Sequence, residues 1–147
     1  MSLKTQVFGI DINYICEGSG DFVVLLHGWG SNITLFNSMI DVLKTKYTVI
    51  APDMPGFGGS GEPEEPWDVS KYVDFVIEFL KPFNIKSLTL LGHSFGGRVI
   101  LKMFERGNLP FKIERIILAD SAGVKPKKTL KQKIKLYSYK LKKNILN

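Results

Sequence analysis

Cysteine is nearly absent from this sequence, which contains only Cys16 among its 147 residues. A disulfide within the chain is therefore excluded, and a lone thiol also rules out the cysteine clusters that hold structural zinc. Proteins of the reducing cytoplasm rarely form disulfides, so we expect a cytoplasmic protein.

Long hydrophobic runs are missing as well. The apolar run Phe22–Leu26 ends after five residues at His27, whereas a membrane-spanning helix needs about 18 such residues. Residues 1–6 lack the apolar stretch and small-residue cleavage site of a secretory signal. We therefore expect no membrane span and no leader peptide. The hydrophobic content of 44% is typical of a soluble domain with its own core.

Acidic side chains are absent from residues 125–147, which hold nine of the 20 basic residues. The other 124 residues contain 11 basic and 14 acidic side chains, so the net charge of +6 comes entirely from this last segment. A mildly acidic body is unsuited to bind nucleic acid. The composition divides the chain into a body, residues 1–124, and a basic segment, residues 125–147.

Hydrophobic patterning predicts a strand hairpin followed by alternating strands and helices. The predicted strands are Leu3–Phe8, Ile12–Glu17, Phe22–Leu26, Tyr47–Ala51, Ser87–Leu91 and Arg115–Ala119. The predicted helices have apolar stripes at Leu35, Phe36, Met39, Ile40 and Leu43, at Val69, Tyr72, Val73, Val76, Leu80 and Phe83, and along Phe95–Arg106. This order predicts the α/β class, with a mostly parallel sheet and helices on both faces.

Ser94 lies in the most informative stretch, Gly92-His93-Ser94-Phe95-Gly96-Gly97. The stretch falls where a buried strand passes into a helix, and a sharp turn there strains the serine and exposes its hydroxyl at the carboxyl edge of the sheet. The positive end of the following helix favours an anionic intermediate near the serine. Ser94 is therefore the candidate nucleophile.

A second segment, residues 27–30, follows the strand Phe22–Leu26 and should lie at the same edge as Ser94. Acyl transfer needs two hydrogen-bond donors aimed at the developing oxyanion, and the backbone N–H groups of Trp29 and Phe95 are the natural pair. Asp53, in the Gly- and Pro-rich loop 52–66, is expected to bind loop amides.

Three motifs occur in a fixed order: His-Gly-Trp-Gly at 27–30, Asp-Met-Pro-Gly-Phe-Gly at 53–58 and Gly-His-Ser-Phe-Gly-Gly at 92–97. Together they resemble the α/β-hydrolase superfamily over about residues 3–123. The chain is most similar to small bacterial carboxylesterases and to C–C hydrolases of aromatic-ring degradation. Haloalkane dehalogenases and epoxide hydrolases use an aspartate nucleophile and are disfavoured, since position 94 is serine. The resemblance implies a three-layer sandwich.

In this family the catalytic triad runs Ser, acid, His along the chain. Here the only histidines, His27 and His93, both precede Ser94. The family resemblance makes His27 structural, and the sharp turn should point His93 away from the Ser94 hydroxyl. We therefore expect neither to be the general base. A missing C-terminal portion or a partner chain would then supply the catalytic histidine.

Asp120 follows the last predicted strand. A minority of the family places the catalytic acid at this point, and most members place it one strand later. Residues 120–123, Asp-Ser-Ala-Gly, also form an ordinary turn sequence. Asp120 is thus either the acid or a turn residue.

The basic segment carries apolar residues at helical spacing: Leu130, Ile134, Tyr137, Leu141 and Ile145. In the family this position begins a helical cap domain over the active site. Binding of an anionic membrane or nucleic acid by a basic amphipathic helix is the alternative. The sheet is expected to be truncated after its sixth strand, so the chain would be a fragment, a truncated gene product or half of an assembly.

These observations predict a serine hydrolase that acts on a small, partly apolar ester or acyl substrate through an acyl-enzyme. No metal or organic cofactor is implied. A non-catalytic α/β-hydrolase-like module and a C–C hydrolase of a dienoate-type diketone are the alternatives.

Overall fold

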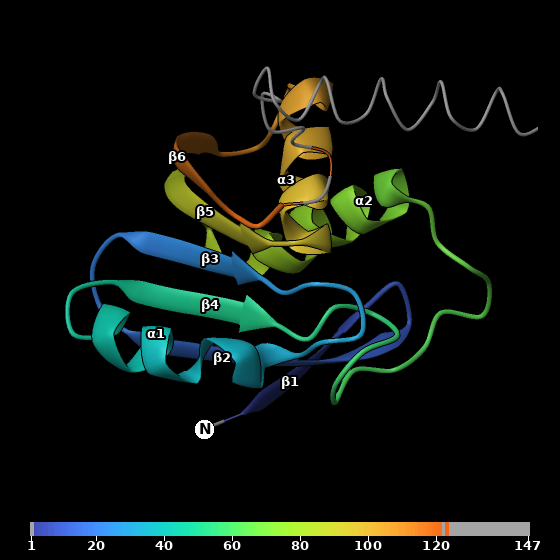
Figure 1. Cartoon of the computed structure of the whole chain (residues 1–147), viewed down its shortest axis with the longest axis horizontal. Helices are drawn as coiled ribbons and strands as arrows, with labels where there is room; N and C mark the ends of the chain where they lie inside the picture. The colour runs from blue at the N-terminus through green and yellow to red at the C-terminus, as the bar shows by residue number, and fades with distance from the viewer. Residues whose placement is uncertain (1, 122, 124–147) are drawn as a thin grey trace, which may run out of the picture.

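The computed structural model describes residues 2–121 and 123 (Figure 1). Its strands are β1 (Leu3–Val7), β2 (Ile10–Gly18), β3 (Phe22–Leu26), β4 (Thr48–Pro52), β5 (Ser87–His93) and β6 (Lys112–Ala119). Its helices are η1 (Ile33–Phe36), α1 (Asn37–Leu43), α2 (Val69–Leu80), η2 (Lys81–Phe83) and α3 (Phe95–Arg106). The predicted hairpin and the alternation of strands and helices are confirmed.

The six strands form one sheet in the order β1-β2-β4-β3-β5-β6. The hairpin strands β1 and β2 run antiparallel to each other, and β2 also pairs antiparallel with β4. The strands β4, β3, β5 and β6 are mutually parallel, which confirms a mostly parallel α/β sheet. The chain reverses its direction of winding at β3, which lies between β4 and β5. Ligand sites of such sheets form outside the carboxyl ends of the strands at this point.

Two hydrophobic clusters cover the two faces of the sheet and create three layers. Val24 and Leu26 of β3 pack with α2 and α3 on one face. Val23 and Leu25 of the same strand pack with η1 and α1 on the other face. Successive side chains of a strand point to opposite faces, so an unbroken apolar run is what a strand between two helical layers requires. Figure 1 shows α1 on the opposite side of the sheet from α2 and α3.

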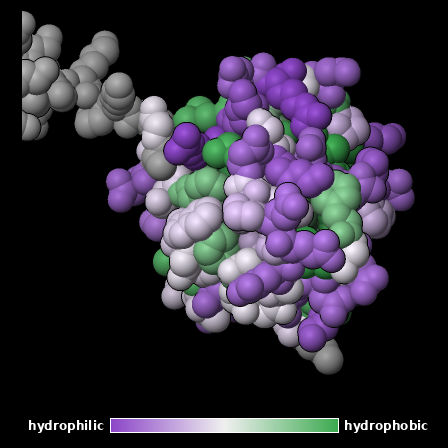
Figure 2. All heavy atoms as spheres, turned by 90° about the vertical axis from the view of Figure 1, so that its right-hand side faces the viewer, coloured by the Kyte–Doolittle hydropathy of each residue, from purple (hydrophilic) through white to green (hydrophobic). Residues whose placement is uncertain are grey.

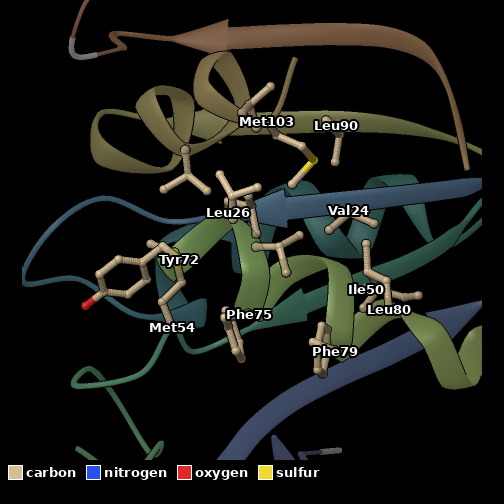
Figure 3. Packing of buried hydrophobic residues seen from close by; sticks show 14 of the residues in the cluster. Val24, Leu26, Ile50, Met54, Tyr72, Phe75, Phe79, Leu80, Leu90 and Met103 are labelled. Carbon is tan, nitrogen blue, oxygen red and sulfur yellow. The ribbon is translucent and has the colours of Figure 1, made fainter. Parts of the chain in front are cut away.

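The larger cluster is centred on α2 (Figure 3). Phe75 and Phe79 are stacked, with ring centroids 5.8 Å apart, and both are buried although they lie outside the predicted apolar stripe. The buried face of α2 is therefore wider than the apolar stripe that the sequence predicted. Its N-cap is Asp68, whose carboxylate accepts the Lys71 N–H at 2.8 Å.

The first predicted helix differs from the expectation. It begins as the 3-10 turn η1, capped by the Asn32 side chain, and this changes the phase of the following turns. Leu35 and Met39, predicted to face the core, are therefore exposed, and Ile33 is buried instead. Several strands also extend beyond their predicted bounds, β6 by three residues at its start. The sequence did not predict this extension because Lys112 and Glu114 are charged and interrupt the apolar pattern.

β6 is the last strand of the sheet among the described residues, and its Ile117 is exposed. Residues 125–147, the predicted cap helix, lie outside the described part of the chain. Across residues 2–121 and 123, every helix is too short or too polar to cross a bilayer.

Candidate active site

The three motif segments meet at the carboxyl edge of the central strands. β3 pairs in parallel with both β4 and β5, and Leu26 at the end of β3 lies opposite Gly92 of β5. The segments that leave these strands, residues 27–30, 53–58 and 94–97, are therefore neighbours at one edge (Figure 1). Figure 2 looks onto this edge, where hydrophilic side chains surround separate hydrophobic patches.

Ser94 has a backbone conformation that non-glycine residues rarely adopt, with φ +50° and ψ −110°. Its N–H donates to the Ala119 carbonyl of β6 at 3.0 Å, and its own carbonyl accepts the Arg98 N–H at 3.3 Å. Serine at a helix N-cap usually turns its hydroxyl toward the helix, yet the Ser94 side chain makes no capping hydrogen bond with α3. The fold therefore stores strain at this residue and leaves its hydroxyl free of the helix.

Two glycines allow the segments to approach Ser94 closely. A Cβ at Gly96 would lie 2.1 Å from the Leu26 carbonyl oxygen, so α3 touches the end of β3. A Cβ at Gly28 would lie 3.1 Å from the Ser94 Cβ. The segment 27–30 is therefore in direct contact with the nucleophile turn, as expected.

The structure also brings Trp29 and Phe95 together, with ring centroids 5.2 Å apart at nearly perpendicular planes. Phe57 contacts Trp29 from the loop after β4, with centroids 4.9 Å apart. Trp29 is 65% exposed, whereas Phe57 and Phe95 pack against the larger core cluster, so this aromatic group extends from the core to the open edge. Among the described residues, neither the Trp29 N–H nor the Phe95 N–H donates a hydrogen bond. Both predicted oxyanion donors are thus unused within this part of the chain.

Asp53 is 3% exposed and binds loop groups, as predicted. One carboxylate oxygen accepts the Ile33 N–H at 2.7 Å. The other accepts the Gly59 N–H at 2.7 Å and Asn13 Nδ2 at 2.8 Å. Charge-assisted hydrogen bonds are about twice as strong as neutral ones. This carboxylate therefore ties together the start of η1, strand β2 and the loop after β4.

His27 is fully buried and uses both ring nitrogens in the structure. Its Nδ1–H donates to the Gly28 carbonyl oxygen at 2.8 Å, and its Nε2 accepts the Met54 N–H at 2.9 Å. Only the neutral ring satisfies both partners, because Met54 offers a donor and Gly28 an acceptor. Burial lowers the pKa of His27 below its usual value, although the Gly28 bond and the charge of Asp53 oppose this.

We expect His27 to make the protein less stable in mild acid. Its pKa is lower in the folded state, so below the ordinary value of about 6.5 the unfolded chain binds a proton that the native ring refuses. Above about pH 6.5 the neutral His27 ring makes its full contribution to the free energy of unfolding. As the pH falls below this value, the free energy of unfolding decreases by up to about 1.4 kcal/mol per pH unit. Urea unfolding between pH 7.5 and 5 would measure it. His27→Gln keeps a donor and an acceptor but does not titrate, so equal pH slopes for both proteins would contradict the prediction.

His93, the second histidine, lies beside Gly28. Its Nδ1 would be 3.0 Å from a Cβ at Gly28, and this nitrogen is buried without a hydrogen-bond partner among the described residues. Within that same part of the chain, no hydrogen bond joins either histidine to Ser94.

Asp120 is exposed at the end of β6 and has φ +46°, a conformation typical of turns. It directly follows Ala119, whose carbonyl holds the Ser94 N–H, so it stands near the nucleophile turn. The sequence interpretation missed its neighbour Ser121. The Ser121 hydroxyl donates to the Gly92 carbonyl at 3.2 Å and lies where a Cβ at Gly97 would be. Its position directly after a strand that reaches the same edge was the available signal.

The described residues contain no group of three or more histidine, cysteine, aspartate or glutamate side chains arranged to hold a metal ion. Within the described residues, the groups available for chemistry at this site are the Ser94 hydroxyl and the backbone N–H groups of Trp29 and Phe95, bordered by aromatic rings.

Known proteins share this sequence pattern and this fold. The family model of the alpha/beta hydrolase fold matches residues 21–144. The 2-hydroxymuconate semialdehyde hydrolase of Pseudomonas sp. (strain CF600) is 34% identical over 121 residues, which are 79% of this chain and 42% of that protein. The soluble epoxide hydrolase of Corynebacterium sp. (strain C12) is 31% identical over 117 residues, covering 80% of this chain and 40% of that protein.

A solved structure shows the same arrangement. An esterase from Exiguobacterium antarcticum superposes with a TM-score of 0.77 and 30% identity, covering 84% of this chain and 46% of that chain. The chain spans less than half the length of each of these three relatives. Because the family model matches most of the sequence and the fold agrees with it, the chain belongs to the α/β-hydrolase family.

Proposed function

We propose that this chain carries the nucleophile of a serine hydrolase that cleaves a small, partly apolar ester through an acyl-enzyme. The observation that supports this most is the backbone of Ser94, at φ +50° and ψ −110°, with a hydroxyl that does not cap its own helix. A strained serine at a strand-to-helix turn, at the carboxyl edge of a parallel sheet, is the geometry of an exposed nucleophile.

In the proposed reaction the Ser94 oxygen attacks the substrate carbonyl carbon and loses its proton to a base. The N–H groups of Trp29 and Phe95 stabilise the oxyanion of the tetrahedral intermediate. Their support is that both are free among the described residues and that α3 begins at Phe95, where helix N–H groups lack intrahelical partners. The alcohol then leaves, and water hydrolyses the acyl-enzyme to release the acid.

We place the general base outside this chain. Both nitrogens of His27 are already hydrogen-bonded, and a ring that accepts the Met54 N–H has no lone pair left for a serine proton. His93 makes no hydrogen bond to Ser94 among the described residues. The C-terminal portion that the longer relatives contain, or a partner chain, would then provide the histidine. Asp120 stays a candidate for the acid that orients it.

Phosphonylation of Ser94 tests the nucleophile and the missing base together. The chain is treated with a small fluorophosphonate, with and without added imidazole, and its intact mass is followed over time. Without a base a serine hydroxyl is a poor nucleophile, so we expect slow labelling that rises with imidazole concentration. Peptide mapping should place the adduct on Ser94.

The control is Ser94→Ala, which removes only the hydroxyl and should abolish the adduct with and without imidazole. Equal labelling of both proteins would contradict the assignment of Ser94. Rapid labelling without imidazole would contradict the external base, and His93→Ala beside His27→Gln would then identify the internal one. A folded protein that never reacts, even with imidazole, would favour a non-catalytic module.

Cleavage of a carbon–carbon bond is the second candidate, and one observation favours it: the Pseudomonas relative is named a 2-hydroxymuconate semialdehyde hydrolase. The protein completed by its downstream sequence, or by its partner, is compared on p-nitrophenyl acetate and on a dienoate-type diketone. Ester hydrolysis alone would support the leading proposal, whereas preference for the diketone would replace it.

Two further assignments are proposals of the same kind. The helical spacing of apolar residues in 125–147 supports a first cap helix over the edge that holds Ser94. The single cysteine supports a cytoplasmic location.

A further inference from the structure

A pocket of about 620 Å³ lies away from Ser94, between the turn of the β1–β2 hairpin and the loop that leads into α2. Phe8 and Trp67 form an aromatic wall, with ring centroids 6.2 Å apart and nearly perpendicular planes. Four acidic residues are also part of its lining: Asp11, Glu62, Glu64 and Glu65.

The chain's own cation already occupies this wall. The Lys71 ammonium lies 4.7 Å from the centre of the Phe8 ring and 5.9 Å from that of the Trp67 ring. Both distances are within the range of a cation–π interaction, in which the negative face of a ring attracts a positive charge. The rings are thus arranged to hold an ammonium group.

The charge of the pocket is not balanced by Lys71. Against this one cation stand four carboxylates, and of these Asp11 also accepts a hydrogen bond from Gln6 Nε2 at 2.8 Å. The described lining therefore keeps a net negative charge. A hollow with several carboxylates and two ring faces attracts organic cations and repels anions.

We propose that this pocket is a binding site for an alkylammonium group, either quaternary or protonated, and that Lys71 is its internal competitor. The assignment does not depend on the hydrolase proposal. The two sites are nevertheless connected by packed rings, since Tyr72 contacts both Trp67, at 5.4 Å, and Phe95 beside the nucleophile, at 5.2 Å. One ring, that of Tyr72, therefore separates this pocket from the aromatic group that borders Ser94.

Tetramethylammonium is the probe, and tert-butanol is its neutral counterpart of similar size. The chain has two tryptophans, so its two indole N–H signals in a ¹⁵N–¹H spectrum report on both sites and are assigned with Trp29→Phe. We expect tetramethylammonium to shift the Trp67 signal with saturation in the millimolar range, more weakly at high salt. Equal binding of tert-butanol would overturn the proposal, because the pocket would then be merely apolar.

Two variants test the roles of the ring and the lysine. Phe8→Leu keeps apolar bulk at an exposed site but removes the ring face, and should weaken tetramethylammonium binding by about two- to fivefold. Lys71→Ala removes the competing charge and should tighten binding by about threefold or more. Unchanged or weaker binding by Lys71→Ala would overturn the proposal even if Phe8→Leu failed to fold. Ser94→Ala should bind the probe normally, which separates this result from the fate of the proposed function.

Discussion

Replacing Gly96 by alanine is expected to destabilise the protein by about 3 kcal/mol or more, and to leave Ser94 unreactive. The added Cβ would lie 2.1 Å from the Leu26 carbonyl oxygen and 2.8 Å from that of His27. Both neighbours are backbone atoms at the end of β3, so no side-chain rotation can relieve the clash. α3 would have to move away from β3, and with it the turn that holds Ser94.

The matched control is Gly30→Ala, four residues from the end of β3. Gly30 has φ +69°, but no atom of the described residues lies within 4 Å of its Cβ position, so this change carries only the conformational cost of about 1–2 kcal/mol. Urea unfolding compares the two variants, and fluorophosphonate labelling in imidazole follows Ser94. A Gly96→Ala protein as stable as Gly30→Ala would mean that α3 does not require this close approach.

Replacing Asp53 by alanine should have the second large effect, a loss of about 4 kcal/mol of unfolding free energy. Three donors, the Ile33 and Gly59 N–H groups and Asn13 Nδ2, would lose their acceptor. Each of these hydrogen bonds involves a charge and lies at a buried or half-buried site, where an unpaired donor is costly. The loops that border Trp29 and Phe57 would lose their common anchor.

Asp53→Asn separates the charge from the shape of the side chain. Its single amide oxygen can accept from one side, but its NH₂ group then faces a donor on the other, so we expect about half the loss seen with alanine. Asp68→Ala is the control. Within the described part of the chain this exposed N-cap side chain has one partner, the Lys71 N–H, and its loss should cost about 1 kcal/mol. Urea midpoints would decide; an Asp53→Ala loss no larger than that of Asp68→Ala would contradict the anchoring role.

The nucleophile turn was predictable because its signal is local. A buried strand, a serine between glycines and a helix follow one another within about twenty residues, and each is specified by its own composition. The predicted position of residues 27–30 at the same edge as Ser94 followed from strand ends that share one edge, and the rings of Trp29 and Phe95 do meet there. The Asp53 bonds to loop amides were predicted from the tendency of an aspartate in a turn to accept hydrogen bonds from nearby backbone N–H groups.

Other predictions were wrong for two reasons. Some side chains are buried by residues far away in the sequence, and in one helix an initial 3-10 turn rotates the side chains that follow it. Leu35 and Met39 have helical spacing, but the 3-10 turn capped by Asn32 rotates them into solvent. Phe75 and Phe79 lie outside the predicted stripe and are buried, because the hairpin strands cover a further face of α2. The hydrogen bond of Ser121 was not predicted, because its partner Gly92 is 29 residues away along the chain.

The sequence by itself determined the α/β class, the order of strands and helices and the strained position of Ser94, because these depend on hydrophobic period, turn residues and motif spacing along the chain. Only the tertiary structure decided which segments stand beside that serine. It placed β3 between β4 and β5, engaged both nitrogens of His27 and gathered Phe8, Trp67 and Lys71 around one pocket. These contacts join residues far apart in the chain, and they form only when the two helical layers close on the sheet and bury its apolar faces.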